Sequence, residues 1–193
     1  MKNILSRPVI IYFLKFAGAF CLLYFGTLAI IGLSAPGGYY SPFISKYLNY
    51  VEWLRMSLLV SSKLFLSFLG YSSFIKGEYI LQLNEGAAIK MVYKCAGYGV
   101  MSFWSAFIIA NTGSLFTKIK WIFLGLITIW LINILRISLL LIALQKKWDI
   151  PLGFDHHTWF NIFSYLYIFI LIYFYDKSQK SNALTLQTNN GSF

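Results

Sequence analysis

Charged side chains are scarce in this chain of 193 residues, and acidic ones are the scarcest. Only 11% of the residues carry a charge and only six are Asp or Glu, whereas 59% are hydrophobic and 20% aromatic. A soluble domain has charge on about a quarter of its residues, so this chain has too little to cover a water-facing surface. Intrinsic disorder is excluded too, because it requires low hydrophobicity. The composition therefore indicates an integral membrane protein.

Cysteine is also scarce, since the chain contains only Cys21 and Cys95. Two thiols allow at most one disulfide bond and cannot build a cysteine-rich zinc site. The adjacent residues His156 and His157 cannot readily share one tetrahedral metal ion, and no third ligand is evident in the sequence. We therefore expect neither a metal ion nor another cofactor.

Basic residues outnumber acidic ones by sixteen to six, which gives a net charge of +10. In a membrane protein, such an excess marks loops that face anionic headgroups and sets the orientation of the spans. No feature of the chain suggests binding to nucleic acid. The expected environment is the lipid bilayer.

The apolar residues gather in runs whose length approaches or exceeds the roughly 20 residues needed to cross a bilayer. These predicted spans are residues 9–33, 97–111, 121–144 and 159–175. Residues 51–70 fit either a further span or an amphipathic helix in the headgroup plane. Three charges, Glu52, Arg55 and Lys63, favour the interfacial alternative.

Residues 71–94 are the part of the chain that lacks a helical pattern. Two β-rich stretches, 79–83 and 88–93, flank the turn signal at 84–87 and predict a β-hairpin. The expected fold is an all-α polytopic membrane protein with about four transmembrane helices, an interfacial helix and a small extracytoplasmic hairpin. Residues 1–180 would form one integral-membrane catalytic domain, and residues 181–193 a disordered cytoplasmic tail.

Charge in the turns predicts which side of the membrane each segment faces. Cys95 precedes one predicted span and the histidine pair follows the next, so two crossings separate them and they face the same side. The turn containing Lys118 and Lys120 favours the cytoplasm. We therefore expect both termini inside, and Cys95 and the histidines on the extracytoplasmic side of the cytoplasmic membrane.

Cys95 has the surroundings of a reactive thiol. It follows Lys94 at the start of a predicted span, and a helix N-terminus or a nearby cation favours the thiolate form of a cysteine. Gly97 would let a substrate backbone approach closely. Cys21 lies deep in the first apolar run, so we expect it to be a packing residue.

Arg136 lies inside a predicted span, and placing an arginine there costs a few kcal/mol or more of insertion free energy. It therefore needs a polar partner or a function. It lies about 15 residues into its predicted span, or roughly 22 Å, which places it in the outer third of the bilayer near Cys95. Asn133 lies three residues earlier on the same helical face, where its amide can orient the guanidinium. Arg136 could stabilise a thiolate or an oxyanion, or it could only hold helices together.

His156 and His157 precede the last predicted span. A histidine can act as general base toward a thiol and as general acid toward a leaving amine. Asn161 lies four residues after His157 and can orient it, while His156 points elsewhere and remains the alternative. A cysteine nucleophile, a histidine base and an arginine for the oxyanion together predict a thiol acyl-transfer site at the outer face of the membrane.

At these residues the chain resembles the exosortase/archaeosortase family of integral-membrane cysteine transpeptidases, as a compact bacterial member. The resemblance consists of Cys95-Ala96-Gly97 at the head of a span, Asn133-Ile134-Leu135-Arg136-Ile137 in the next, and His157 before the last. It implies that Cys95 is the nucleophile, Arg136 the stabiliser of substrate or oxyanion, and His157, or His156, the acid and base. It also implies a membrane-tethered surface protein as substrate, whose C-terminal sorting signal is cleaved with transfer of the acyl group to an acceptor.

A function of another class is a non-catalytic membrane component of surface-polysaccharide assembly or of small-solute transport. In such a protein Arg136 would contact an anionic headgroup or solute. A carrier would be favoured by two related halves or by interrupted spans, and neither is visible in the sequence.

Overall fold

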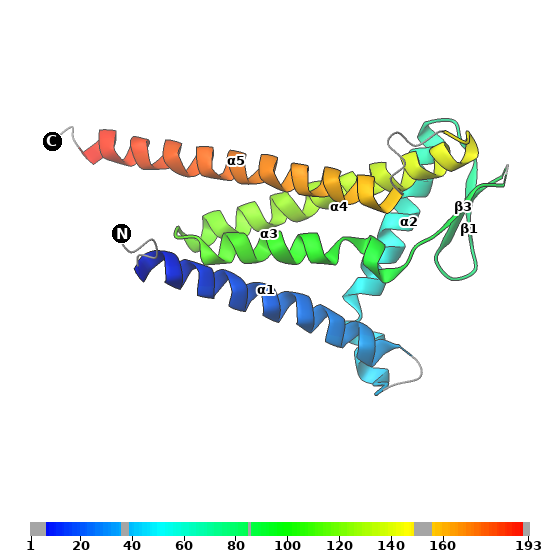
Figure 1. Cartoon of the computed structure of the whole chain (residues 1–193), viewed down its shortest axis with the longest axis horizontal. Coiled ribbons are helices and arrows are strands. Elements are labelled where there is room, and N and C mark those ends of the chain that lie inside the picture. Colours follow the sequence, from blue (N-terminus) through cyan, green and yellow to red (C-terminus); the bar gives the residue numbers. More distant parts are fainter. Residues whose placement is uncertain (1–6, 36–38, 85, 149–155, 191–193) are drawn as a thin grey trace. The chain divides into compact units, whose positions relative to one another are not determined.

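The computed structural model describes residues 7–35, 39–84, 86–148 and 156–190 (Figure 1). The chain divides into two units, residues 1–149 and residues 150–193. The first unit contains helices α1 (Arg7–Ser34), η1 (Ile44–Leu48), α2 (Tyr50–Phe68), η2 (Tyr93–Ala96), α3 (Tyr98–Ala110) and α4 (Leu115–Gln145), and strands β1 (Ser73–Lys76), β2 (Ile80–Leu83) and β3 (Ala88–Lys90). The second unit contains helix α5 (His156–Asn190).

Two of the predicted spans are confirmed as long apolar helices. Within the described residues, α1 and α4 are each long and apolar enough to cross a membrane. Helix α3 is apolar but has only 13 residues, which rise about 20 Å and fall short of a hydrocarbon core of about 30 Å. The predicted total of four crossings stays a prediction.

Helix α5 differs from the prediction at its C-terminal end. It contains the predicted span at residues 159–175 and continues to Asn190, whereas the sequence predicts a disordered tail from Ser181. No glycine or proline interrupts the chain between His156 and Asn190, and Gly191 follows directly. The helix therefore extends through polar residues up to the next glycine, a residue that is common just beyond helix ends.

The predicted hairpin is confirmed as strands β2 and β3, but the sheet contains a third strand that the sequence analysis missed. Strand β1 pairs antiparallel with β2 in the order β1-β2-β3, with Phe74 opposite Gln82 and Leu81 opposite Ile89. An isolated two-stranded hairpin is only marginally stable in water, so the third strand and packing against a helix are needed to stabilise it. The correction is a three-stranded sheet in place of a hairpin.

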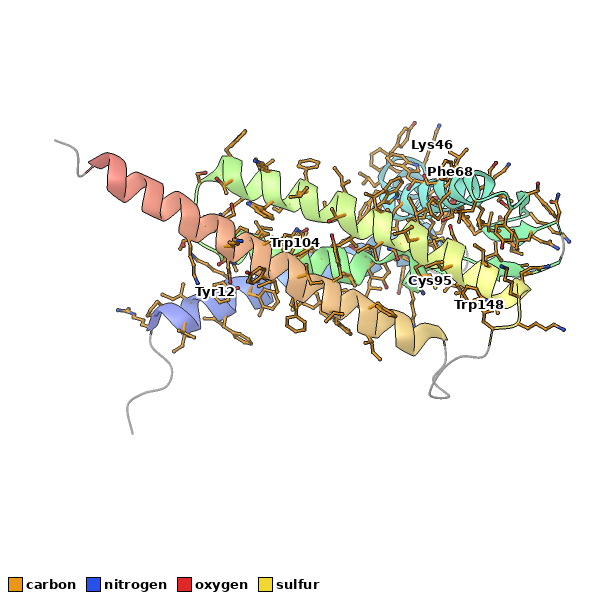
Figure 2. All side chains as sticks on the ribbon, turned by 90° about the horizontal axis from the view of Figure 1, so that it is seen from above. Tyr12, Lys46, Phe68, Cys95, Trp104 and Trp148 are labelled. Carbon is orange, nitrogen blue, oxygen red and sulfur yellow. The ribbon has the colours of Figure 1, made fainter. Side chains whose placement is uncertain are left out.

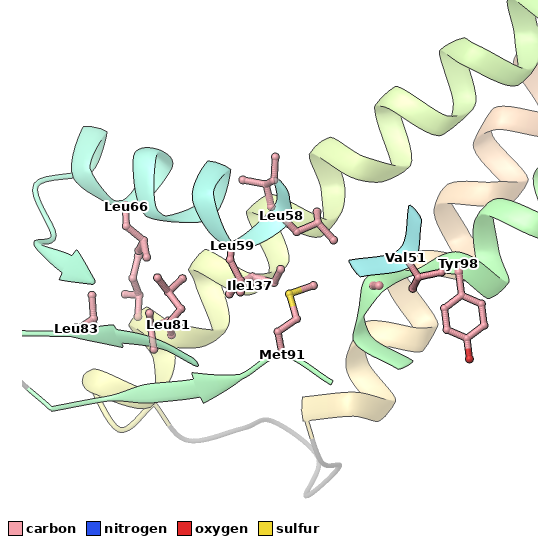
Figure 3. Packing of buried hydrophobic residues seen from close by; sticks show 13 residues of the cluster. Val51, Leu58, Leu59, Leu66, Leu81, Leu83, Met91, Tyr98 and Ile137 are labelled. Carbon is pink, nitrogen blue, oxygen red and sulfur yellow. The ribbon is translucent and has the colours of Figure 1, made fainter. Parts of the chain in front are cut away.

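Helix α2 supplies that cover. Its apolar residues Leu58, Leu59 and Leu66 recur at helical spacing on one buried face, and they pack with Leu81 and Leu83 of β2 in one core cluster (Figure 3). Ile137 and Leu141 of α4 and Met91, which follows β3, belong to the same cluster. The sheet is therefore packed against the helices and is not a separate cap.

The charges of α2 do not face the headgroups as the interfacial prediction assumed. Arg55 is buried and Glu52 is half-buried, and only Lys63 is exposed. The helix instead exposes apolar side chains, among them Trp53, Leu64 and Phe68. Its charge count thus reflects internal polar contacts, and whether α2 spans the bilayer or lies at its surface stays a prediction.

Close packing of α3 on α4 depends on a glycine. Trp104 of α3 is fully buried midway along the helical part of the unit (Figure 2), and its indole Nε1 donates to the carbonyl of Trp121 at 3.0 Å. A Cβ atom added to Gly125 would lie 1.8 Å from that Nε1 atom. Only a residue without a side chain lets the indole reach the backbone of α4.

We therefore expect Gly125→Ala to lower the thermal unfolding midpoint of the detergent-solubilised protein. The indole must move and its hydrogen bond must break, a change that overpacking data put at about 1–3 kcal/mol. The matched control is Gly18→Ala on α1, where nothing lies within 4 Å of the added Cβ and helix propensity should rise slightly. Equal midpoints for the two variants would contradict this account of α3–α4 packing.

Candidate active site

Cys95 lies on η2, the short turn that connects the sheet to α3. The turn ends at Gly97, the N-cap of α3, and the Cys95 backbone N–H donates to the carbonyl of Val92 at 2.9 Å. Its thiol is free and half-buried. Figure 2 shows Cys95 toward the sheet end of the first unit, whereas Tyr12 lies near the opposite end of the helices. The cysteine therefore stands one turn ahead of the helix that the sequence predicts it to head.

Arg136 of α4 contacts Cys95 at two atoms. Its Nη1 atom donates to the Cys95 carbonyl oxygen at 3.4 Å, and its Nη2 atom lies 3.8 Å from Sγ. The sequence predicts these two residues at similar depth, and the structure brings them into direct contact. A guanidinium in this position can accompany a thiolate and can also reach an oxygen of a group bound to the sulfur.

Asn133 contacts the next carbonyl of the same turn. Its side chain is 2% exposed, and Nδ2 donates to the Ala96 carbonyl oxygen at 3.3 Å. The sequence analysis expected this amide to orient Arg136. The structure instead shows the two α4 side chains holding consecutive carbonyls of η2, one each.

Gly97 has a different role from the one its sequence position suggested. Its φ of +79° lies in the left-handed region that favours glycine. A Cβ atom at this position would lie 2.4 Å from the Nδ2 atom of Asn133. The missing side chain therefore makes room for Asn133, where the sequence analysis expected room for a substrate.

The predicted histidine partner of Cys95 belongs to the second unit. His156 and His157 begin α5 in the second unit, and the side chains of both, with that of Asn161, lie outside the described residues. The assignment of an acid and base to His157 or to His156 stays a prediction.

A second arginine, Arg55 of α2, lies beside the segment that leads into η2, and the sequence analysis missed it. Its guanidinium carbon lies 3.6 Å from the ring centre of Tyr79 and 4.1 Å from that of Tyr93. Its Nη2 atom donates to the Met91 carbonyl oxygen at 2.5 Å. Tyr79 and Tyr93, at the two ends of the predicted hairpin, were the sequence signal that could have indicated a binding site for this arginine, because arginine stacks well on aromatic rings.

Tyr79 connects this arginine to a carboxylate. Its hydroxyl donates to Glu52, and Asn49 also donates to Glu52, at 2.7 Å. Burial is the main cause that raises the pKa of Tyr79 above its ordinary value, and the hydrogen bond to Glu52 raises it further. The phenol therefore stays neutral and keeps donating at physiological pH.

The first unit also contains an apolar cavity of about 740 Å³ between helices α1 to α4. Tyr98, three residues after Cys95, lines it together with Trp53 and Leu54 of α2 and Trp130 of α4. The Trp130 indole donates to the hydroxyl of Ser57 at 3.1 Å, so these two polar groups of the wall are paired with each other.

These features describe a protein with long apolar helices in which a free cysteine on a short turn lies against an arginine of α4, a helix long and apolar enough to cross a membrane. Comparison with known families agrees with that description, because the family described as "Transmembrane exosortase (Exosortase_EpsH)" matches residues 4–174. The chain belongs to this family. No curated protein and no solved structure matches the chain.

The packing of Gly97 against Asn133 predicts that Gly97→Ala disturbs the turn that carries Cys95. Alanine is disfavoured at a φ of +79° by about 1–2 kcal/mol, and its Cβ would displace the Asn133 amide from the Ala96 carbonyl. We expect a lower thermal unfolding midpoint and a changed rate of Cys95 alkylation.

The matched control is Gly99→Ala, two residues further along. Its added Cβ would lie at an ordinary 3.5 Å from the ring of Tyr24, so stability and alkylation should be nearly unchanged. A variant pair that behaves alike would show that the contact between Gly97 and Asn133 does not matter.

Proposed function

We propose that this protein is a membrane-embedded cysteine protease and transpeptidase. It cleaves the C-terminal sorting signal of a membrane-tethered surface protein at the outer face of the cytoplasmic membrane and transfers the acyl group to an acceptor. The observation that carries the proposal is the double contact of one guanidinium with Cys95, at the sulfur and at the carbonyl oxygen. Membership of the transmembrane exosortase family supports it.

The chemistry follows from these positions. The Cys95 thiolate attacks the carbonyl carbon of the scissile peptide bond, and the negative charge moves to the carbonyl oxygen. Arg136, close to the sulfur, stabilises that oxyanion through charge and hydrogen bonding. The C–N bond then breaks, a protonated histidine gives its proton to the leaving amine, and a thioester remains on Cys95. His157 is the proposed acid, with His156 as the alternative.

The acceptor completes the cycle by attacking the thioester carbonyl, which releases Cys95 as a thiolate. The general base for this second step is the same histidine, now neutral, which takes the proton of the acceptor nucleophile. Neither step needs a cofactor.

The apolar cavity supports a substrate that is anchored in the membrane. It lies between the helices of the first unit and is lined by Tyr98, the first residue of α3, three residues after Cys95. Apolar walls suit a hydrophobic segment next to a scissile bond better than they suit a charged solute. In the proposed orientation, with four spans, the N-terminal end of α4, which carries Lys118 and Lys120, faces the cytoplasm and Cys95 faces the outer side.

Replacing the proposed nucleophile should abolish processing. In cells that carry Cys95→Ala, cleavage of the substrate should fall below about a thousandth of the normal rate, because the acyl-enzyme cannot form. Mass spectrometry of the substrate's C-terminus measures the result. The control is Cys21→Ser, which removes the other, exposed thiol and should leave processing intact. Normal cleavage by Cys95→Ala would refute the proposal.

The same assay distinguishes the two histidines. His157→Ala should reduce processing by about 10²- to 10⁴-fold, the usual contribution of a general acid and base, whereas His156→Ala should have a small effect. The reverse result would assign the role to His156. Full activity in both variants would contradict a histidine acid in this reaction.

A further inference from the structure

The turn that carries Cys95 is contacted by two arginines from different helices. Arg136 of α4 contacts Cys95 itself, at its carbonyl oxygen and sulfur. Arg55 of α2 contacts the residues just before it, through the Met91 carbonyl and the Tyr93 ring. The segment from Met91 to Cys95 is therefore contacted by two arginines, and of the two only Arg136 touches the sulfur.

The contacts of Arg55 lie at the start of η2. Its donation to the Met91 carbonyl at 2.5 Å fixes the backbone two residues before the turn, and its guanidinium lies against Tyr93, the first residue of the turn. Met91 is also tied to the sheet, because its N–H donates to the Tyr79 carbonyl at 2.8 Å. These contacts hold the backbone at Met91 and the side chain of Tyr93, four and two residues before Cys95.

Arg55 is itself buried among contacts from α2 and the sheet. It is 5% exposed, and its second aromatic contact, Tyr79, donates its hydroxyl to Glu52, one turn earlier on the same helix. Asn49 caps the start of α2 and donates to the same carboxylate at 2.7 Å. Tyr79 has a φ of 63°, unusual for a residue other than glycine, so its ring is kept in place by these contacts at the expense of an unfavourable backbone conformation.

We propose that Arg55 is a positioning residue for Cys95: by holding Met91 and Tyr93, it keeps the sulfur in contact with Arg136. Arg55 does not touch the sulfur and takes no part in bond making. The inference rests on the proposed function only in treating Cys95 as the nucleophile, and its test uses no substrate.

The test measures alkylation of Cys95 by iodoacetamide in the full-length, detergent-solubilised protein. A Cys21→Ser background leaves Cys95 as the one cysteine of the chain. Rates are compared at about pH 7 and about pH 9, on either side of the ordinary thiol pKa of about 8.5. A change in exposure scales both rates equally, so their ratio reports the environment of the thiolate. Lys94, the exposed neighbour of Cys95, is present in every variant, so its effect on the thiol is the same in all of them and does not alter the comparison of their ratios.

Arg136→Gln should lower the ratio of the pH 7 rate to the pH 9 rate, because the cation next to the sulfur is lost. Arg55→Met should lower the ratio in the same direction by about twofold or more, the range of coupling seen between residues that share a network. The double variant should match Arg136→Gln alone, since Arg55 acts through that contact. Lys63→Met, which removes an exposed charge from the same helix, should leave the ratio unchanged.

Two results would overturn the proposal. An unchanged ratio in Arg55→Met would mean that Arg55 serves only the stability of the fold. Multiplying effects in the double variant would mean that Arg55 acts on the thiol by its own charge. If Arg55→Met does not fold, the same ratio is measured in Tyr93→Leu. This variant removes one stacking contact of Arg55 and should lower the ratio of the pH 7 rate to the pH 9 rate in the same way. Failure of the Cys95→Ala processing test would leave this result intact, so the two proposals fail separately.

Discussion

The hydrogen bonds from α4 to the two carbonyls of η2 are the interactions on which the site depends. A helical turn as short as η2 leaves backbone carbonyls without partners inside the turn, and a membrane protein has little water with which to satisfy them. Arg136 and Asn133 supply the missing donors to Cys95 and Ala96, respectively. The requirement for these donors explains why an asparagine and an arginine occur close together in the apolar part of α4 and why the residue facing Asn133 is a glycine.

The parts of the fold that could be predicted from the sequence are those that depend on local pattern. Long apolar runs predicted α1 and α4, and alternating β-rich residues around a turn signal predicted β2 and β3. Strand β1 has only four residues, and pairing with β2 rather than its own pattern defines it. The helical end of α5 was missed because its polar composition resembles a tail, although nothing in that segment interrupts a helix.

The candidate site was predictable to a similar extent. Few charges occur in the spans, so the pair of Cys95 and Arg136 could be chosen from the sequence, and the structure brings them together. The partners of Arg55 were not predictable, because they are two aromatic rings and a carbonyl, none of which carries a charge pattern. The charge of Arg55 was counted in favour of an interfacial α2, whereas the structure buries this side chain against its own partners. The chain has few carboxylates to pair with its arginines, and here the rings of Tyr79 and Tyr93 stabilise the positive charge of Arg55 through cation–π contacts.

The shortness of η2 limits the conformational entropy of the segment that carries Cys95. The turn has four residues, with fixed backbone contacts just before it at Met91 and at its end at Cys95 and Ala96. Such a segment has few alternative conformations, so the entropy of ordering it is lost once, when the chain folds. In the proposed reaction, little further entropy would be lost at the sulfur when a substrate binds, so the binding energy could serve to align the substrate.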